Sequence, residues 1–160
     1  MKADNIVALR GALAAAAVHR ERVLAAMERL ADRMPRNGAD IAAMEYADIA
    51  SAELLLSRFA KLQDLLGARL FPLAAAASEE PLRPDATFLD LLHRLEKVGA
   101  IPSAAGWRRL RELRNELAHD YPDDVEAAAV ALASVMRAAP DLLAVLARVQ
   151  AHVERTGVLA

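Results

Sequence analysis

Residues 55–70 read LLSRFAKLQDLLGARL, and this stretch decides the fold class. Its large apolar side chains recur at intervals of three or four residues, at Leu55, Phe59, Leu62, Leu66 and Leu70. On a helix of about 3.6 residues per turn, this spacing forms one continuous stripe. No run in the chain alternates apolar and polar residues at every second position, as a half-buried strand would. The sequence therefore predicts an all-α fold.

Composition supports the same fold class and limits the number of domains. The chain has 160 residues, of which 56% are hydrophobic and 4% are aromatic. Much of the apolar set is alanine and leucine, the strongest helix formers. A chain of this length can bury one real hydrophobic core, and we find neither an internal repeat nor a domain boundary. We expect a single domain over residues 1–160, built as an antiparallel four-helix bundle with short extra helices.

Proline and turn residues divide the first half of the chain. The first helix is expected over about residues 4–33, followed by a turn at residues 35–38. A second, long helix is expected over about residues 39–77. Pro72 should kink or end it, because the proline ring clashes with the carbonyl four residues back. Residues 78–84, with two prolines and two glutamates, are the clearest loop in the sequence.

Two shorter helices are expected to follow this loop. Asp85 is the predicted N-cap of the third helix, and Gly99 is the predicted left-handed residue at its end. His93 lies within this helix between apolar neighbours, and we interpret it as a structural side chain. Ser103 is the predicted N-cap of the fourth helix, whose buried stripe begins at Trp107.

Two prolines mark the C-terminal region. Pro122, followed by Asp123 and Asp124, opens a fifth helix in the preferred manner, with carboxylates near the positive end of the helix dipole. Pro140 and Asp141 repeat this pattern. The region is therefore expected to be either two helices or one helix with a sharp break.

Charge and cysteine content limit the function and the location. The net charge of −2 argues against a chain that binds nucleic acid over its whole surface, so any contact with RNA should be local. The absence of cysteine excludes disulfides and thiolate metal sites and fits a reducing cytoplasm. The apolar run at residues 12–18 is too short to cross a bilayer. We expect a soluble, cytoplasmic protein without a membrane contact.

The end of the fourth helix carries the candidate site. Residues 113–122 read LRNELAHDYP, which places Arg114, Asn115, His119 and Tyr121 within eight residues. Asn115 and His119 are four apart and would share a helix face. Arg114 and His119 are five apart, about 140° around a regular helix. They converge if the last turn unwinds before the proline, or if the same corner of a second protomer faces this one.

These side chains suit the cleavage of RNA without a metal ion. Attack of a 2′-hydroxyl on its own phosphate needs proton transfer, which the imidazole of His119 can perform because its ordinary pKa lies near 6.5. The developing negative charge needs a fixed cation, and the guanidinium of Arg114 offers paired donors to phosphate. One motif histidine per chain is one too few for a separate base and acid. A symmetric dimer supplies two, so we expect dimerisation.

A purely structural role is the alternative for each of these residues. Arg114 would then pair with Glu116, Asp120 or a carboxylate on a neighbouring helix. His119 would contact carbonyl groups at its helix end, where a protonated ring is favoured. Asn115 would bond to a loop, and Tyr121 would pack its ring in the corner.

The pattern R-N-x3-H-x-Y resembles the motif of the HEPN ribonuclease family, in particular of its HepT-like toxins. The resemblance implies a homodimeric helical bundle in which two motifs meet and form a metal-independent endoribonuclease site, without a cofactor. It makes Arg114 and His119 catalytic and Asn115 supporting. It also implies a cognate nucleotidyltransferase antitoxin that attaches AMP to Tyr121 and so silences the toxin. Residues 78–84 and the length after Pro140 do not map onto the family pattern.

Two further interpretations stay open. Arg58 and Lys61 stand three apart on the long second helix, where they either form a solvated charged face or support the site by touching a phosphate. The protein as a whole is either an endoribonuclease or a non-catalytic helical partner that binds a nucleotidyltransferase and positions its substrate. A third possibility is a structural bundle without a ligand.

Overall fold

The computed structural model describes residues 1–78, 83, 85–117 and 124–160, and within these ranges the protein is all-α. The expectation of an all-α fold is therefore confirmed. The elements are α1 (Ala3–Leu30), α2 (Gly38–Ala42), α3 (Tyr46–Leu65), the π-helical turn η1 (Leu66–Leu70), α4 (Phe71–Ala76), α5 (Phe88–Lys97), α6 (Ala104–Glu116) and α7 (Val125–Arg155).

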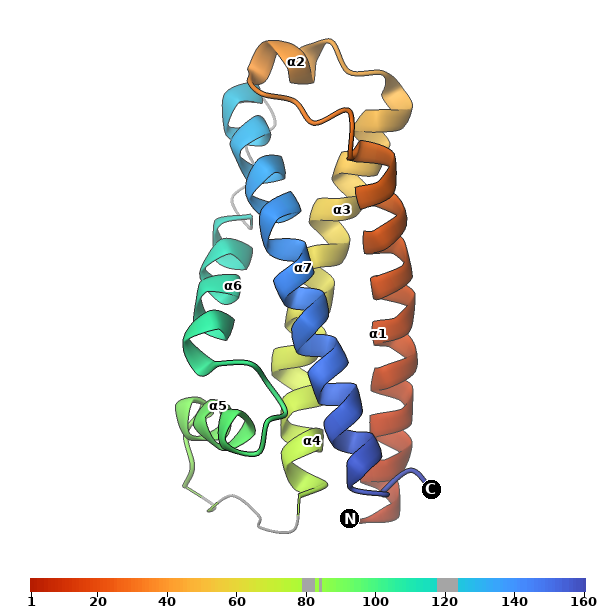
Figure 1. The fold of residues 1–160 in the computed structure, drawn as a ribbon, viewed down its shortest axis with the longest axis vertical. Helices are drawn as coiled ribbons and strands as arrows, with labels where there is room; N and C mark the ends of the chain where they lie inside the picture. Colours follow the sequence, from red (N-terminus) through yellow and green to blue (C-terminus); the bar gives the residue numbers. More distant parts are fainter. Residues whose placement is uncertain (79–82, 84, 118–123) are drawn as a thin grey trace.

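The long elements lie side by side and alternate in direction (Figure 1). α1 rises from the N-terminus, the path from α3 through η1 to α4 descends, α6 rises again, and α7 descends to the C-terminus. α3 packs along α1 and also contacts α6 and α7. The short helix α2 lies across one end and contacts α7, while α5 lies beside α4 and α6 at the other end. α3 and α7 thus each contact several of the other elements.

The core is built on the predicted stripe. All five of its side chains, Leu55, Phe59, Leu62, Leu66 and Leu70, are fully buried. Trp107 of α6 packs against Phe71 with ring centroids 4.5 Å apart and planes at 61°, an edge-to-face contact. This contact fixes α6 against the junction of η1 and α4.

The expected start of the long second helix is wrong. The helical path does not begin near residue 39 and run on, because α2 ends at Ala42 and α3 begins at Tyr46. α2 is separately anchored: the side chain of Asn37 accepts a hydrogen bond from the Asp40 amide, and the Gly38 amide donates to Glu126 of α7 over 2.8 Å. Of the two effects expected at Pro72, an end of the helix is not observed. A π-helical turn precedes the proline, and the helical path continues to Ala76.

At the ends of the next two helices, one predicted cap is wrong and two predictions are confirmed. Thr87, not Asp85, caps α5: its hydroxyl accepts from the Asp90 amide, and the Asp90 carboxylate accepts from the Thr87 amide over 2.8 Å. This reciprocal capping box satisfies two free amides, which outweighs the single bond that an aspartate two residues earlier would offer. Gly99 has φ 71°, and the Ser103 hydroxyl accepts from the Gly106 amide, as predicted.

The C-terminal region is a single helix, which corrects both alternatives at Pro140. α7 runs for 31 residues and continues through Pro140 without a break. Pro140 lies on the exposed side, where water can reach the carbonyl that loses its partner, while Ala139 and Leu142 keep the helix packed on both sides of it. Among the described helices, α7 is long and apolar enough to cross a bilayer, a test that a core helix also passes.

Candidate functional site

The described part of the motif lies on the last turn of α6. This helix ends at Glu116, and Leu117 forms its C-cap, so Arg114 and Asn115 are helical residues. Asn115 is exposed, and Arg114 is half-buried. His119 and Tyr121 lie outside the described residues, as do Pro122 and Asp123. Arg114 and its surroundings are therefore the described part of the candidate site.

Arg114 is held by a carboxylate from α3. Its Nε and Nη2 atoms each donate to one oxygen of Asp64, both over 2.7 Å. This paired geometry, in which two parallel N–H groups meet two oxygens, is the most specific one that a guanidinium can make. The hydrogen bond and the charge of Asp64 raise the pKa of Arg114 above its ordinary value. Among the alternatives for Arg114, the carboxylate of a neighbouring helix is observed, while Asp120 lies outside the described residues.

The ion pair leaves part of the guanidinium available. Nε and Nη2 face Asp64, whereas Nη1 makes no hydrogen bond to the described residues. The side chains of Arg114 and Asp64 keep 30% and 49% of their surface exposed. Solvent therefore reaches the pair, and Asp64 fixes the plane of the guanidinium.

A cavity of about 440 Å³ lies beside this pair, between α3, η1, α5 and α6. It is lined by Gln63, Asp64, Gly67, Ala68, Phe88, Trp107, Arg111 and Arg114. The Arg111 guanidinium stacks over the Phe88 ring, 5.6 Å from its centre. The indole Nε1 of Trp107 is buried and has no hydrogen-bond partner among the described residues. Gly67 keeps the cavity open, since an added Cβ would come 3.1 Å from the Trp107 ring.

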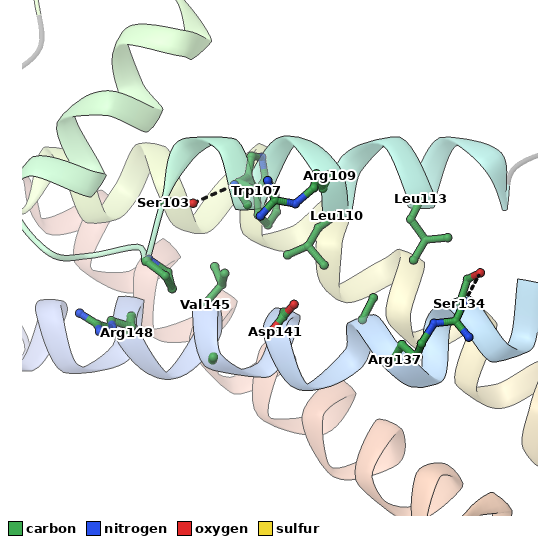
Figure 2. A pocket seen from close by; sticks show the side chains of 14 residues that line it. Ser103, Trp107, Arg109, Leu110, Leu113, Ser134, Arg137, Asp141, Val145 and Arg148 are labelled. Carbon is green, nitrogen blue, oxygen red and sulfur yellow. Dashed lines mark hydrogen bonds between the residues drawn. The ribbon is translucent and has the colours of Figure 1, made fainter.

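The basic residues of α6 face different surroundings. Arg111 stacks on α5, and Arg114 pairs with α3, whereas Arg109 lines a groove of about 850 Å³ between α6 and α7. Figure 2 shows Leu110 and Leu113 pointing from α6 toward α7, and Arg137 and Arg148 lying at opposite ends of the groove on α7. These basic residues are thus divided among three sides of the helix.

Arg58 and Lys61 lie at the contact between α3 and α1. Nη1 of Arg58 is 3.3 Å from Nδ1 of His19 on α1, and Lys61 is exposed one helical turn before Asp64. Among the described residues, neither cation forms an ion pair with Asp64, which already pairs with Arg114. Arg58 and Asp64 are six residues apart, which places them about 120° apart around α3. The sequence did not point to His19, since its proximity depends on how α1 packs against α3.

A second histidine is buried at the far end of the bundle. Nε2 of His152 on α7 lies 3.2 Å from the Ser78 hydroxyl, beside a cavity of about 570 Å³ that Arg94, Lys97 and Arg155 also line. Burial is the main reason that the pKa of His152 lies below its ordinary value, and the charge of Arg155 adds to the effect. These cations lie in the last turns of α5 and α7, where positive charge offsets the helix dipole. His93, in contrast, is exposed on α5.

No metal site accompanies these groups in the part of the chain that the structure describes, where no three His, Asp or Glu side chains gather in a way that could hold an ion. Comparison of the chain with protein-family models, with curated proteins and with solved structures finds no significant match.

Proposed function

We propose that the protein is a metal-independent endoribonuclease of the HEPN type, a HepT-like toxin in which two copies of the R-N-x3-H-x-Y motif form one site across a homodimer interface. The observation that carries the proposal is Arg114: a partly exposed guanidinium at the end of α6, oriented by two 2.7 Å bonds to Asp64, with no hydrogen bond from Nη1 to the described residues. The alternating directions of the long helices suit a HEPN-like antiparallel four-helix bundle.

The proposed chemistry divides the work between two residue types. The Nη1 edge of Arg114 receives a non-bridging oxygen of the scissile phosphate and stabilises the charge that develops there. His119 of one protomer accepts the 2′-hydroxyl proton, and His119 of the other donates a proton to the leaving 5′-oxygen. The products are a 2′,3′-cyclic phosphate and a free 5′-hydroxyl, so no water or metal enters the cleavage step.

Asp64 has a positioning role in the proposed site. Its carboxylate offsets much of the positive charge of Arg114, so the pair attracts a phosphodiester weakly, and the identical pair of the twin motif does the same. Asp64 then acts as a positioning residue that fixes the guanidinium plane, a contribution that matters because small errors in orientation are costly in catalysis.

Regulation follows from the place of Tyr121 in the motif. Transfer of AMP to its hydroxyl by a cognate nucleotidyltransferase antitoxin would put bulk and negative charge beside the phosphate site and repel RNA. The protein is proposed to act in the cytoplasm with that antitoxin and RNA as its partners.

The test is cleavage of a labelled single-stranded RNA by the purified protein in EDTA. We expect cleavage by the wild type and a loss of at least about a hundredfold in His119→Ala and Arg114→Ala, the range typical for removal of an acid–base or charge-stabilising group. Arg108→Ala and His93→Ala are matched controls, because both side chains are exposed and lie outside the motif. They should cleave like the wild type.

Circular dichroism spectra of all four variants should coincide with that of the wild type, which separates a lost site from a lost fold. Cleavage that requires a divalent metal, or that survives in His119→Ala, contradicts the proposal.

A further inference from the structure

Four basic side chains meet where α1 packs against α3. His19 and Arg22 come from α1, and Arg58 and Lys61 come from α3; we call them the α1–α3 basic cluster. Nη1 of Arg58 lies 3.3 Å from Nδ1 of His19. Burial lowers the pKa of His19, and the charges of Arg58, Lys61 and Arg22 lower it further, so the four groups interact. The cluster is a concentration of positive charge in a chain whose net charge is −2.

Counter-ions for this cluster are missing from the described residues. Arg22, Arg58 and Lys61 take part in no ion pair there. At the positions three and four residues away along each helix, the only acidic side chain is Asp64, and Arg114 already engages both of its oxygens. Like charges at such close positions destabilise a fold. An anion bound from solution would reduce this repulsion between the cations.

Arg58 is already positioned for such an anion. Its side chain is half-buried, and its Nε is fully buried with no hydrogen-bond partner. The 3.3 Å contact has Nη1 donating to Nδ1 of His19, which requires a neutral ring with its proton on Nε2. The guanidinium of Arg58 is therefore oriented by packing and by His19, whereas that of Arg114 is oriented by a carboxylate. The Nη2 atom of Arg58 has no hydrogen bond to the described residues.

We propose that the α1–α3 basic cluster binds the phosphates of a single-stranded RNA backbone and leads the strand to Arg114. Arg22 and Lys61 are exposed, and on each helix the two members of the cluster are three residues apart, with Cβ atoms about 5–6 Å from one another. Lys61 lies one helical turn from Asp64, which holds Arg114. The identity of the polymer rests on the proposed function; the existence of an anion site rests on the unpaired cations.

Binding should also change the state of His19. A phosphate beside the ring favours its protonated form, so the pKa of His19 should rise when the cluster is occupied. The ring would then turn from an acceptor toward Arg58 into a further cation on the phosphate. Occupancy of the cluster is therefore reported by His19 itself.

The test uses a short, fluorescently labelled 2′-O-methyl RNA, which lacks the nucleophile for cleavage, so binding is measured whether or not the protein is a nuclease. Its affinity is followed by anisotropy over a series of salt concentrations. Each phosphate contact on a single strand contributes about −0.7 to the slope of log K against log salt. Arg22→Ala and Lys61→Ala should each make the slope less steep by about that amount and weaken binding.

Arg20→Ala is the matched control, since Arg20 carries the same charge on the exposed side of α1 but does not act on His19. Its slope should equal that of the wild type. If Arg22→Ala and Lys61→Ala bind like Arg20→Ala, the proposed backbone site is wrong, even where the wild type cleaves RNA. If they lose affinity in a protein that cleaves nothing, the backbone site stands and the nuclease proposal fails.

A second readout follows the His19 ring by NMR titration. We expect the 2′-O-methyl RNA to raise the pKa of His19, and inorganic phosphate at the same concentration of phosphate groups to raise it far less. An equal rise with inorganic phosphate would overturn the assignment to a polymer backbone.

Discussion

The ion pair between Arg114 and Asp64 orients the guanidinium more than it stabilises the fold. Both side chains keep a large part of their surface in water, and exposed pairs contribute little because solvent screens them and two flexible side chains lose entropy. The paired geometry nevertheless restricts the guanidinium to one plane. Substitutions at these positions should therefore affect the site more than the fold.

We expect Arg114→Ala, Asp64→Ala and the double variant each to lower the free energy of unfolding by less than about 1 kcal/mol. A double-mutant cycle from urea unfolding should give a coupling energy of about 0.2–1 kcal/mol. Asp64→Ala should in addition slow RNA cleavage while leaving the purified protein folded. A coupling energy of several kcal/mol would mean that the pair is a structural anchor and would weaken its assignment to the site.

His152 makes the stability of the bundle depend on pH. Burial lowers its pKa in the folded protein, and the charge of Arg155 lowers it further, against a hydrogen bond with the Ala74 backbone that raises it. The unfolded chain therefore takes up a proton near pH 6.5, while the folded chain resists it. Stability is fully present above about pH 6.5 and is lost as pH falls toward the lower, folded pKa.

We expect the free energy of unfolding of the wild type to decrease between pH 7.5 and pH 5.5, as measured by urea titration. In His152→Gln the decrease should be smaller, although not absent, because the pKa of His19 is lowered as well. The exposed His93→Gln variant should retain the full decrease. An unchanged pH profile in His152→Gln would show that burial does not lower the pKa of His152 in the folded protein.

Thr87 and Asp85 can be compared directly as N-cap residues of α5. Thr87→Ala should lower the free energy of unfolding by about 0.5–2 kcal/mol, because it removes the hydroxyl that accepts from the Asp90 amide. Asp85→Ala should change it little, since that exposed carboxylate only approaches Arg83 at 3.9 Å. Thermal or urea unfolding of the two variants checks the assignment, and a larger loss in Asp85→Ala would reverse it.

Local rules predicted the elements that depend on local chemistry. The leucine stripe of α3, the left-handed Gly99 and the Ser103 cap follow from spacing or from one residue's conformational preference, and all are observed. Pro140 is an exception to these local rules. Its preference against a helix interior is outweighed by the buried residues on either side of it, which keep α7 continuous.

In the candidate site, too, the sequence predicted the local features but not the contacts between helices. The motif places Arg114 and Asn115 at a helix end without any knowledge of packing, and α6 does end at Glu116. The partner of Arg114 is Asp64, 50 residues away, and that of Arg58 is His19, 39 residues away. No periodicity in one helix specifies the register at which it meets another, so these contacts required the structure.

α3 connects the two basic regions of the molecule. Its buried stripe fixes it against α1 and α7, while Arg58 on one side meets His19 and Asp64 on another side meets Arg114. Lys61 lies between the two on the helix surface. A rigid central helix therefore sets the distance between the α1–α3 basic cluster and the motif, so a bound strand would meet both in a fixed relation.

The proposed site is shared between protomers, and this leads to a prediction for mixed dimers. A dimer of one wild-type chain and one His119→Ala chain contains a single motif histidine, which cannot serve as base and acid at once. Its RNA cleavage should fall close to that of the His119→Ala homodimer. If each protomer held an independent site, the mixed dimer would keep half of the wild-type rate.

The mixed dimer can be isolated by tagging the two chains differently and purifying through both tags in sequence. Analytical ultracentrifugation should give twice the 17.2 kDa mass of the chain for every species, which confirms that the substitution leaves association intact. A matched mixed dimer of wild type and His93→Ala should cleave at the wild-type rate. A half rate in the His119→Ala mixture, or a monomer at cleaving concentrations, would remove the reason for placing two motifs at one phosphate, and Arg114 with Asp64 would then have to act within a single chain.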